Sequence, residues 1–139
     1  MNDIIEKCPF CNIDKTKLEN TILNETKYFY ITPSLGALTD GYILIITKRH
    51  VNSMSELMID EMEEYKILIR KYREIFKKVY QKYPIVFEHG TPNLKDSINA
   101  NSVNHAHTHI VNHNYKNENI LIEKLKLKRI DKLESMLWN

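Results

Sequence analysis

The sequence contains little cysteine and little glycine, and it has no long apolar run. Its 139 residues include two Cys and three Gly. No stretch approaches the roughly 18 consecutive apolar residues of a membrane-spanning helix, so we expect no membrane partner. Residues 1–7 include two acids and no apolar region, which argues against a signal peptide and makes the cytoplasm the expected compartment. In that reducing compartment, Cys8 and Cys11 indicate metal or redox chemistry before a structural disulfide.

The sequence also has almost no excess of charge. Lys and Arg number 20 against 18 Asp and Glu, and the two signs alternate along the chain. Because binding through phosphate contacts usually needs a concentrated basic face, we expect no nucleic-acid partner, although a small anionic ligand is compatible with this balance. With 42% hydrophobic and 27% charged residues, the chain fits a globular protein. Residues 1–139 are long enough for one domain that forms a core without disulfides.

The hydrophobic pattern predicts an alternation of strands and helices around one long helix. Ser53 and Glu56 match a capping box at the start of that helix. Apolar residues then recur at helical spacing up to Tyr80, and Pro84 ends the helix. Strands are predicted at 21–25, 28–32, 42–47, 85–88 and 102–111, and further helices at 118–127 and 130–138. Because most strands are linked as hairpins, the order predicts an α+β fold with an antiparallel sheet.

Three of the six histidines fall at alternate positions of the predicted strand 102–111. His105, His107 and His109 would share one face of that strand, and the intervening residues would face the long helix. Protonation of one imidazole in such a row raises the cost of protonating the next. The row therefore needs anions, a metal ion or neutral tautomers at pH 7, and unrelated surface histidines explain it poorly.

Two kinds of chemistry explain the row. In one, two of the histidines bind a catalytic zinc ion that keeps a position open for water. In the other, His107 attacks phosphorus, because a neutral imidazole is a good nucleophile near pH 7 and leaves readily afterwards. Its second ring nitrogen then donates to a fixed acceptor, often a backbone carbonyl. The flanking histidines hold phosphate oxygens and protonate the leaving group.

The run from His105 to Val111, His-Ala-His-Thr-His-Ile-Val, resembles the signature of the histidine triad (HIT) superfamily, in which histidines alternate with apolar residues. Three more segments are similar to that family. They are Ser102-Val103, the segment Gly41 to His50 (Gly-Tyr-Ile-Leu-Ile-Ile-Thr-Lys-Arg-His), and the pair Cys8-x-x-Cys11, which resembles the knuckle of zinc-carrying members. The resemblance spans about residues 8 to 111.

The resemblance implies a HIT-like fold, with a five-stranded antiparallel sheet, one long helix and a C-terminal helix, often paired as a homodimer. It implies a nucleotide phosphohydrolase or nucleotidyl transferase that acts on a nucleoside phosphoramidate or dinucleoside polyphosphate through a nucleotidyl-histidine intermediate. His107 would attack the α-phosphorus. His109 would contact phosphate oxygens and the leaving group, and Ser102 would hydrogen-bond near the scissile oxygen. Transferase branches often carry Gln at the third histidine position, so His109 favours hydrolysis.

Zinc-carrying relatives imply a metal site in the same region. Its ligands here would be Cys8, Cys11, His50 and His105, and a Cys2His2 set is a closed, structural zinc site. Zinc would then take His105 and leave His107 to attack. A metal-free dithiol or a redox pair is the alternative for the two cysteines.

The chain departs from the family pattern where relatives bind the nucleotide. Many relatives carry an Asp after the second strand that holds the ribose hydroxyls, but Ile31-Thr32-Pro33 stands there. Tyr42 replaces the His and Thr47 the Pro of the third-strand segment. The missing carboxylate motivates a second hypothesis, a nucleotide-binding or scaffold protein without turnover.

Three further residues are candidates for substrate binding. Glu88 and His89 occupy the region where relatives have Asn-Glu-Gly, and both could face the phosphate. Asn101 directly precedes Ser102 and could also reach a phosphate, although loop asparagines are common for turn reasons alone.

Overall fold

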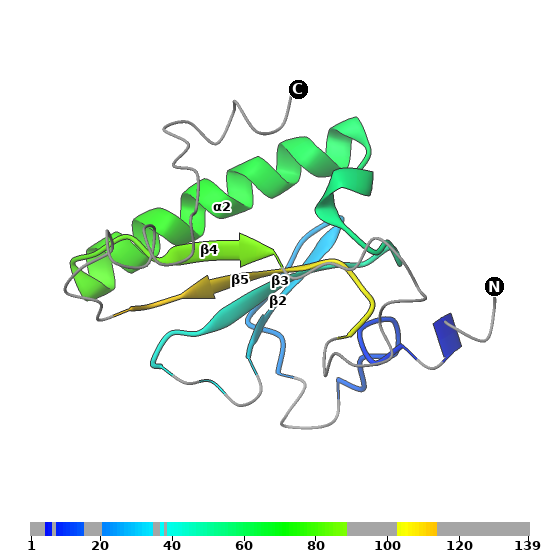
Figure 1. The fold of residues 1–139 in the computed structure, drawn as a ribbon, viewed down its shortest axis with the longest axis horizontal. Helices are drawn as coiled ribbons and strands as arrows, with labels where there is room; N and C mark the ends of the chain where they lie inside the picture. Colours follow the sequence, from blue (N-terminus) through cyan, green and yellow to red (C-terminus); the bar gives the residue numbers. More distant parts are fainter. Residues whose placement is uncertain are drawn as a thin grey trace, which may run out of the picture.

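The sheet of this protein has five strands, and a long helix packs against one of its faces (Figure 1). The computed structural model describes residues 5–6, 8–15, 21–34, 37, 39–88 and 103–113. The strands are β1 (Asn24–Glu25), β2 (Phe29–Pro33), β3 (Ile43–Thr47), β4 (Ile85–Glu88) and β5 (His107–Val111), and the helix is α2 (Ile59–Tyr80). They lie in the order β1-β2-β3-β5-β4, and every neighbouring pair is antiparallel. The expected α+β fold is confirmed, whereas the predicted C-terminal helices lie outside the described residues.

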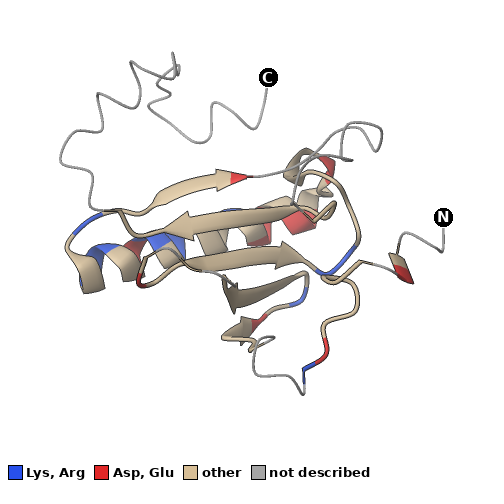
Figure 2. Ribbon diagram, turned by 60° about the horizontal axis from the view of Figure 1, so that its bottom comes forward, with Lys and Arg blue, Asp and Glu red and all other residues tan. Residues whose placement is uncertain are grey.

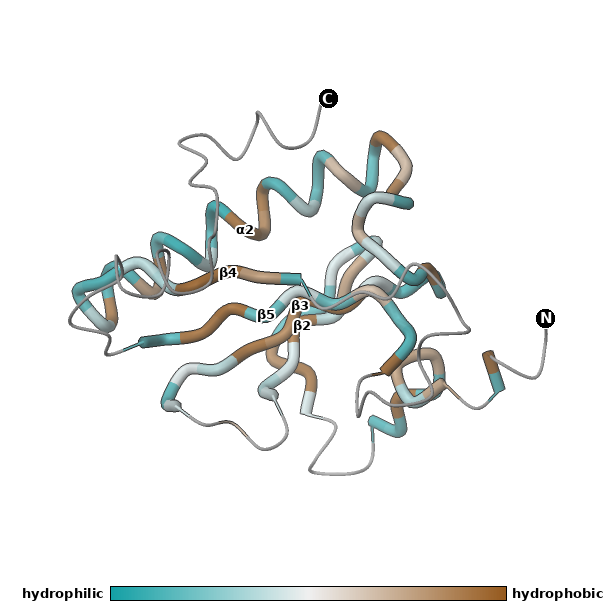
Figure 3. The backbone as a smooth tube through the Cα atoms, viewed as in Figure 1, coloured by the Kyte–Doolittle hydropathy of each residue, from teal (hydrophilic) through white to brown (hydrophobic). Residues whose placement is uncertain are grey.

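The core fills the space between the sheet and α2. Strand residues that point to this face alternate with residues that point away, as the two-residue period of a strand requires. The buried members from the sheet, from the turn before β5 and from α2 are Phe29, Ile31, Ile43, Ile45, Ile110, Ala106, Tyr65, Leu68, Ile69 and Phe76. Hydrophobic and hydrophilic residues alternate along α2 (Figure 3), and charged residues lie mainly on α2 and the loops, leaving most of the sheet uncharged (Figure 2). The face of β5 that points away from α2 is therefore not part of this core and can carry polar side chains.

The long helix starts later than its predicted capping box. Ser53 and Glu56 do form that box, but it caps a 3-10 turn at Met54–Glu56. Leu57 and Met58 then adopt extended backbone, and α2 begins at Ile59. The helix ends before Pro84, because Gln81 takes the left-handed conformation with φ 59°. None of the described helices is long and apolar enough to cross a bilayer.

The predicted strand 102–111 is wrong at its start, because β5 begins only at His107. The preceding residues form a turn, in which the His105 N–H donates to Val103 O at 2.8 Å and the Ala106 N–H donates to Val51 O at 2.7 Å. His105 therefore does not extend the row formed by His107 and His109. The turn directs it toward the N-terminal cysteines instead.

Gly41 forms the turn that leads into β3. Its φ of 76° is a conformation that disfavours residues with a side chain, and a Cβ at this position would collide with the hydroxyl of Tyr80 at the end of α2. Glycine at this position thus lets the loop approach the helix closely. Tyr42, the next residue, then leads into β3 at Ile43.

Candidate functional site

His107 and His109 lie on the face of the sheet that points away from α2. They pair with Ile46 and Leu44 of the neighbouring strand β3. Thr108, between them, points to the helix, where its hydroxyl lies 2.8 Å from the Tyr65 hydroxyl. Burial raises the pKa of Tyr65 to about 12, so this contact joins two neutral hydroxyls. The buried hydroxyl pair thus fixes which face of β5 carries the histidines.

A group of two cysteines and two histidines lies beside this face. The nearest ligand atoms of Cys8, Cys11, His50 and His105 all lie within 4.8 Å of one another. His105 Nδ1 lies 3.2 Å from His50 Nδ1 and 3.4 Å from Cys8 Sγ, and Cys11 Sγ lies 3.2 Å from His50 Nδ1. These residues come from the N-terminal knuckle, the segment after β3 and the turn before β5. The four side chains could hold a metal ion.

The donor geometry fits a tetrahedral ion. Zinc bonds of about 2.3 Å to sulfur and about 2.0 Å to nitrogen give edges of roughly 3.3 to 3.8 Å between ligand atoms. Four of the six separations between the ligand atoms are 3.2 to 3.5 Å, and all six are at most 4.8 Å. A set of two thiols and two imidazoles is also the chemistry that zinc prefers.

The tautomer of His105 suits a metal ligand. Its Nε2 lies 2.7 Å from Thr47 O, and a carbonyl can only accept, so Nε2 carries the hydrogen. Nδ1 is then the bare nitrogen and faces the two sulfurs. Burial lowers the pKa of His105 to about 4, which keeps the ring neutral at pH 7. Donation to a backbone carbonyl is the usual way in which a protein orients a metal-binding histidine.

The cysteines would change protonation when a metal binds. Desolvation, together with its hydrogen bond and charge interaction with Cys8, raises the pKa of Cys11 to about 11. The metal-free thiol is therefore protonated at neutral pH. Because thiolates are the ligands, metal binding to this site releases protons.

An ion pair ties the segment that carries His50 to the long helix. Arg49 donates two hydrogen bonds to Glu61, at 3.0 and 2.6 Å, and a third to Glu56 O at 3.0 Å. The Glu61 side chain is 5% exposed, and it also accepts a hydrogen bond from Met58 N at 2.8 Å. The Arg49 guanidinium lowers the pKa of the Glu61 carboxyl, and burial opposes this shift in part. The pair therefore holds the start of α2 against the residue next to His50.

His107 has a defined tautomer. Its Nδ1 lies 2.6 Å from the carbonyl oxygen of His105, so Nδ1 carries the hydrogen and Nε2 keeps its lone pair. The side chain is buried, and Phe10 of the cysteine knuckle contacts the ring edge-on at a centroid distance of 5.2 Å. Phe10 also contacts His105, at 5.7 Å. The triad pattern suggested the carbonyl contact, but nothing in the sequence singled out Phe10.

His109 lies next to His107, with ring centroids 4.8 Å apart. Its Nδ1 lies 2.7 Å from the hydroxyl of Tyr42, and Phe87 stacks on its ring at 4.6 Å with an interplanar angle of 6°. The sequence marked Tyr42 only as a departure from the family pattern and did not single out Phe87. The strand period would have placed Tyr42 on this face, since it lies two residues before Leu44.

Of the four other predicted site residues, the structure describes Glu88. Ser102, Asn101 and His89 lie outside the described residues. Glu88 ends β4, and its carboxylate accepts a hydrogen bond from Met54 N at 2.6 Å. This contact gives Glu88 a partner in the segment before α2.

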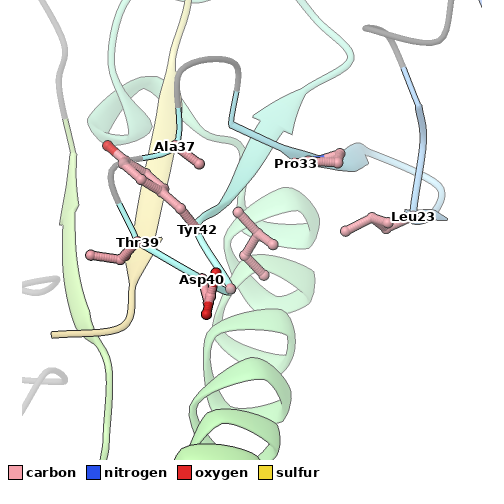
Figure 4. A pocket seen from close by; sticks show the side chains of 8 residues that line it. Leu23, Pro33, Ala37, Thr39, Asp40 and Tyr42 are labelled. Carbon is pink, nitrogen blue, oxygen red and sulfur yellow. The ribbon is translucent and has the colours of Figure 1, made fainter.

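Tyr42 also lines a cavity of about 440 Å³ (Figure 4). Its lining residues are Leu23, Pro33, Ala37, Thr39, Asp40, Gly41, Tyr42 and Ile43. Pro33 belongs to the segment Ile31-Thr32-Pro33, where the family resemblance implies a ribose carboxylate, and Asp40 is the acidic residue among the lining residues. The side chains of Asp40 and Tyr42 point to different sides of the loop (Figure 4).

Comparison with known proteins agrees with this geometry. The HIT domain family model matches residues 15–115, so the chain belongs to the HIT family. An uncharacterized HIT-like protein of Methanocaldococcus jannaschii is 23% identical over 125 residues, which are 89% of this chain and 92% of that protein.

Solved structures show the same fold. A hypothetical protein from Leishmania major has a TM-score of 0.62 at 20% identity, covering 87% of this chain and 92% of that one. A HIT family hydrolase from Clostridium thermocellum has a TM-score of 0.58 at 18% identity, covering 80% and 94%. Diadenosine triphosphate hydrolase of Plasmodium falciparum, solved in complex with Cyclomarin A, also has a TM-score of 0.58 at 18% identity, covering 77% and 82%.

The ion pair between Arg49 and Glu61 predicts a pH-dependent contribution to stability. Glu61→Gln should lower the free energy of unfolding at pH 7 by about 1–3 kcal/mol, because a buried charged hydrogen bond is lost. The folded-state pKa of Glu61 lies below its ordinary value, so the pair contributes fully above that value and is lost as the pH falls through the folded-state pKa.

Urea unfolding at pH 7 and at successively lower pH measures this difference between the variant and the wild-type protein. The exposed neighbour Glu63, changed to Gln, is the matched control and should leave stability within about 0.5 kcal/mol. A difference for Glu61→Gln that stays constant down to acid pH would contradict the assignment.

Proposed function

We propose that this HIT-family protein acts at the α-phosphorus of a nucleoside phosphate conjugate, with His107 as the nucleophile. The observation that supports this most directly is the contact of 2.6 Å between His107 Nδ1 and His105 O. It puts the hydrogen of the neutral imidazole on Nδ1 and the lone pair on Nε2, which is the form a nucleophilic histidine needs.

The reaction that fits this site has two displacements at phosphorus. His107 Nε2 forms a bond to the α-phosphorus while the bond from phosphorus to the leaving group breaks, and the leaving group departs with the electron pair and takes a proton from the solvent. A water molecule then attacks phosphorus and releases one proton to the solvent, and the bond to Nε2 breaks and returns its electron pair to the ring. Overall, one water molecule is divided between the nucleotide and the leaving group. Throughout, the hydrogen stays on His107 Nδ1 and is donated to the His105 carbonyl oxygen, which stabilises the positive charge that the substituted ring carries.

The roles proposed for the remaining site residues follow from the resemblance to the HIT family. His109, beside His107, would contact phosphate oxygens and the leaving group, and Ser102 would hydrogen-bond near the scissile oxygen. Asn101 and His89 are proposed to reach the phosphate from neighbouring segments. Glu88 is proposed to act from the end of β4, in addition to its hydrogen bond with Met54.

The names of similar proteins support the substrate class. One similar fold belongs to a HIT family hydrolase and another to a diadenosine triphosphate hydrolase. We therefore propose nucleoside phosphoramidates or dinucleoside polyphosphates as the substrates. A scaffold that binds a nucleotide without turnover is the second candidate, because Pro33 and its neighbours supply no ribose carboxylate.

We further propose that the metal of the cysteine and histidine group is structural zinc. Four protein ligands close a tetrahedral site, so no position is left for the water that a catalytic zinc ion activates. When bound, such an ion supplies cross-linking of distant segments and no chemistry on the substrate. Of the four proposed ligands, His105 is the one nearest to the nucleophile along the chain. Its Nε2 donates to Thr47 O, and its carbonyl oxygen accepts from His107 Nδ1.

The zinc proposal predicts opposite outcomes for two histidines of the triad. The protein should contain one zinc ion per chain, and His105→Asn should lose it and lower the free energy of unfolding by roughly 3 kcal/mol or more. The matched variant His109→Asn should keep the metal, because His109 is not among the four ligands. Atomic emission spectroscopy and unfolding with and without a chelator measure both effects. Equal zinc contents in the two variants would contradict the assignment.

The catalytic proposal predicts a trapped intermediate. Adenosine phosphoramidate mixed with the wild-type protein and quenched without acid should add the mass of one nucleotidyl group in intact-protein mass spectrometry. His107→Ala should show no added mass and should lose roughly a thousandfold or more in turnover, because the attacking atom is gone. An unchanged zinc content and unfolding midpoint would show that this variant is folded. A wild-type protein that binds nucleotide but behaves like His107→Ala would support the scaffold instead.

A further inference from the structure

Two aromatic residues outside the triad hold the ring of His109. The Tyr42 hydroxyl lies 2.7 Å from His109 Nδ1, and the two ring centroids are 5.6 Å apart. Phe87, which pairs with His109 across β4 and β5, lies parallel to the imidazole at 4.6 Å. The stacked ring limits tilting of the imidazole, and the hydroxyl defines which edge carries Nδ1. His109 is therefore fixed in both position and rotation.

The Tyr42 phenol can act as the donor in this contact. Burial raises the pKa of the phenol, and a hydrogen bond with the Ser34 side chain opposes part of that rise, so the hydroxyl keeps its hydrogen near neutral pH. That O–H can be donated to the nitrogen 2.7 Å away, His109 Nδ1. The Ser34 hydroxyl can itself donate to the phenolic oxygen, so the two partners of Tyr42 do not compete for one hydrogen.

We propose that Tyr42 is a positioning residue that donates its O–H to Nδ1 of His109 and so keeps the hydrogen of that ring on Nε2. The proposal rests on the function proposed above, because in that reaction the Nε2–H donates to a phosphate oxygen or to the leaving group beside His107.

The two neighbouring imidazoles then have opposite chemical character. His107 meets an acceptor at Nδ1, the His105 carbonyl, and so presents a bare Nε2 for attack. His109 meets a donor at Nδ1, the Tyr42 hydroxyl, and so presents Nε2–H. Since their centroids are 4.8 Å apart, one ring can bond to phosphorus while the other donates to an oxygen or leaving atom on it.

A phenol at this position also avoids extra positive charge. The family pattern has a histidine where this chain has Tyr42, and a histidine can become cationic near neutral pH. A phenol donates a hydrogen bond without that possibility, since its ordinary pKa is about 10. His109 therefore has a neutral donor beside it, which matches the neutral tautomers that a close row of imidazoles requires.

Nitrogen-15 NMR of the zinc-loaded protein with labelled histidine tests the tautomer directly. The wild-type spectrum should show His109 with hydrogen on Nε2 and a hydrogen-bonded, bare Nδ1. Tyr42→Phe keeps the aromatic ring and removes the donor, so the His109 signals should move toward the average of the two tautomers. Tyr30→Phe, which removes a hydroxyl from strand β2, is the matched control and should leave them unchanged. Hydrogen on Nδ1 of wild-type His109 would overturn the proposal.

Kinetics supply the second readout. Tyr42→Phe should lower kcat roughly tenfold, as expected for one neutral hydrogen bond, and should change KM by about twofold or less. An unchanged kcat together with unchanged His109 signals would overturn the proposal. If the wild-type protein turns over no substrate, the proposed function fails, but the spectrum still decides whether Tyr42 sets the tautomer of His109.

Discussion

The hydrogen bond from His107 to the carbonyl of His105 is the interaction on which the rest of the site depends. It joins two residues only two positions apart, at 2.6 Å, and fixes which nitrogen of His107 has a lone pair. It can form because β5 starts at His107, so that His105 lies in a turn. Each polar group of His105 then has its own partner, since Nδ1 faces the cysteines, Nε2 donates to Thr47, and the carbonyl accepts from His107.

Residues far apart in the chain converge on that turn. The knuckle brings Cys8 and Cys11 to His105 across more than 90 residues, and it brings Phe10 against both His105 and His107. The Arg49 ion pair ties the segment beside His50 to α2. The cysteine and histidine group and the proposed nucleophile are therefore parts of one packed unit. A metal ion bound there would restrain the backbone that sets the tautomer of His107.

The sequence predicted what local patterns encode. The two-residue period placed His107 and His109 on one face, and the spacing of Cys8 and Cys11 suggested their use as ligands. Such local patterns do not encode contacts between segments that are distant in the sequence. The turn at His105 depends on hydrogen bonds to Val51 and Val103, and the stacking of Phe87 on His109 depends on the register of β4 and β5. The capping box at Ser53 was real but capped a short turn, because Leu57 and Met58 take extended backbone.

The decisive measurement is a crystal structure of the zinc-loaded protein soaked with AMP and with GMP. We expect zinc on Cys8, Cys11, His50 and His105, and a phosphate group whose phosphorus faces His107 Nε2. The N–H of His109 should then donate to one of its oxygens. Zinc bound to His107, or a phosphate placed away from it, would contradict the division of roles between these histidines.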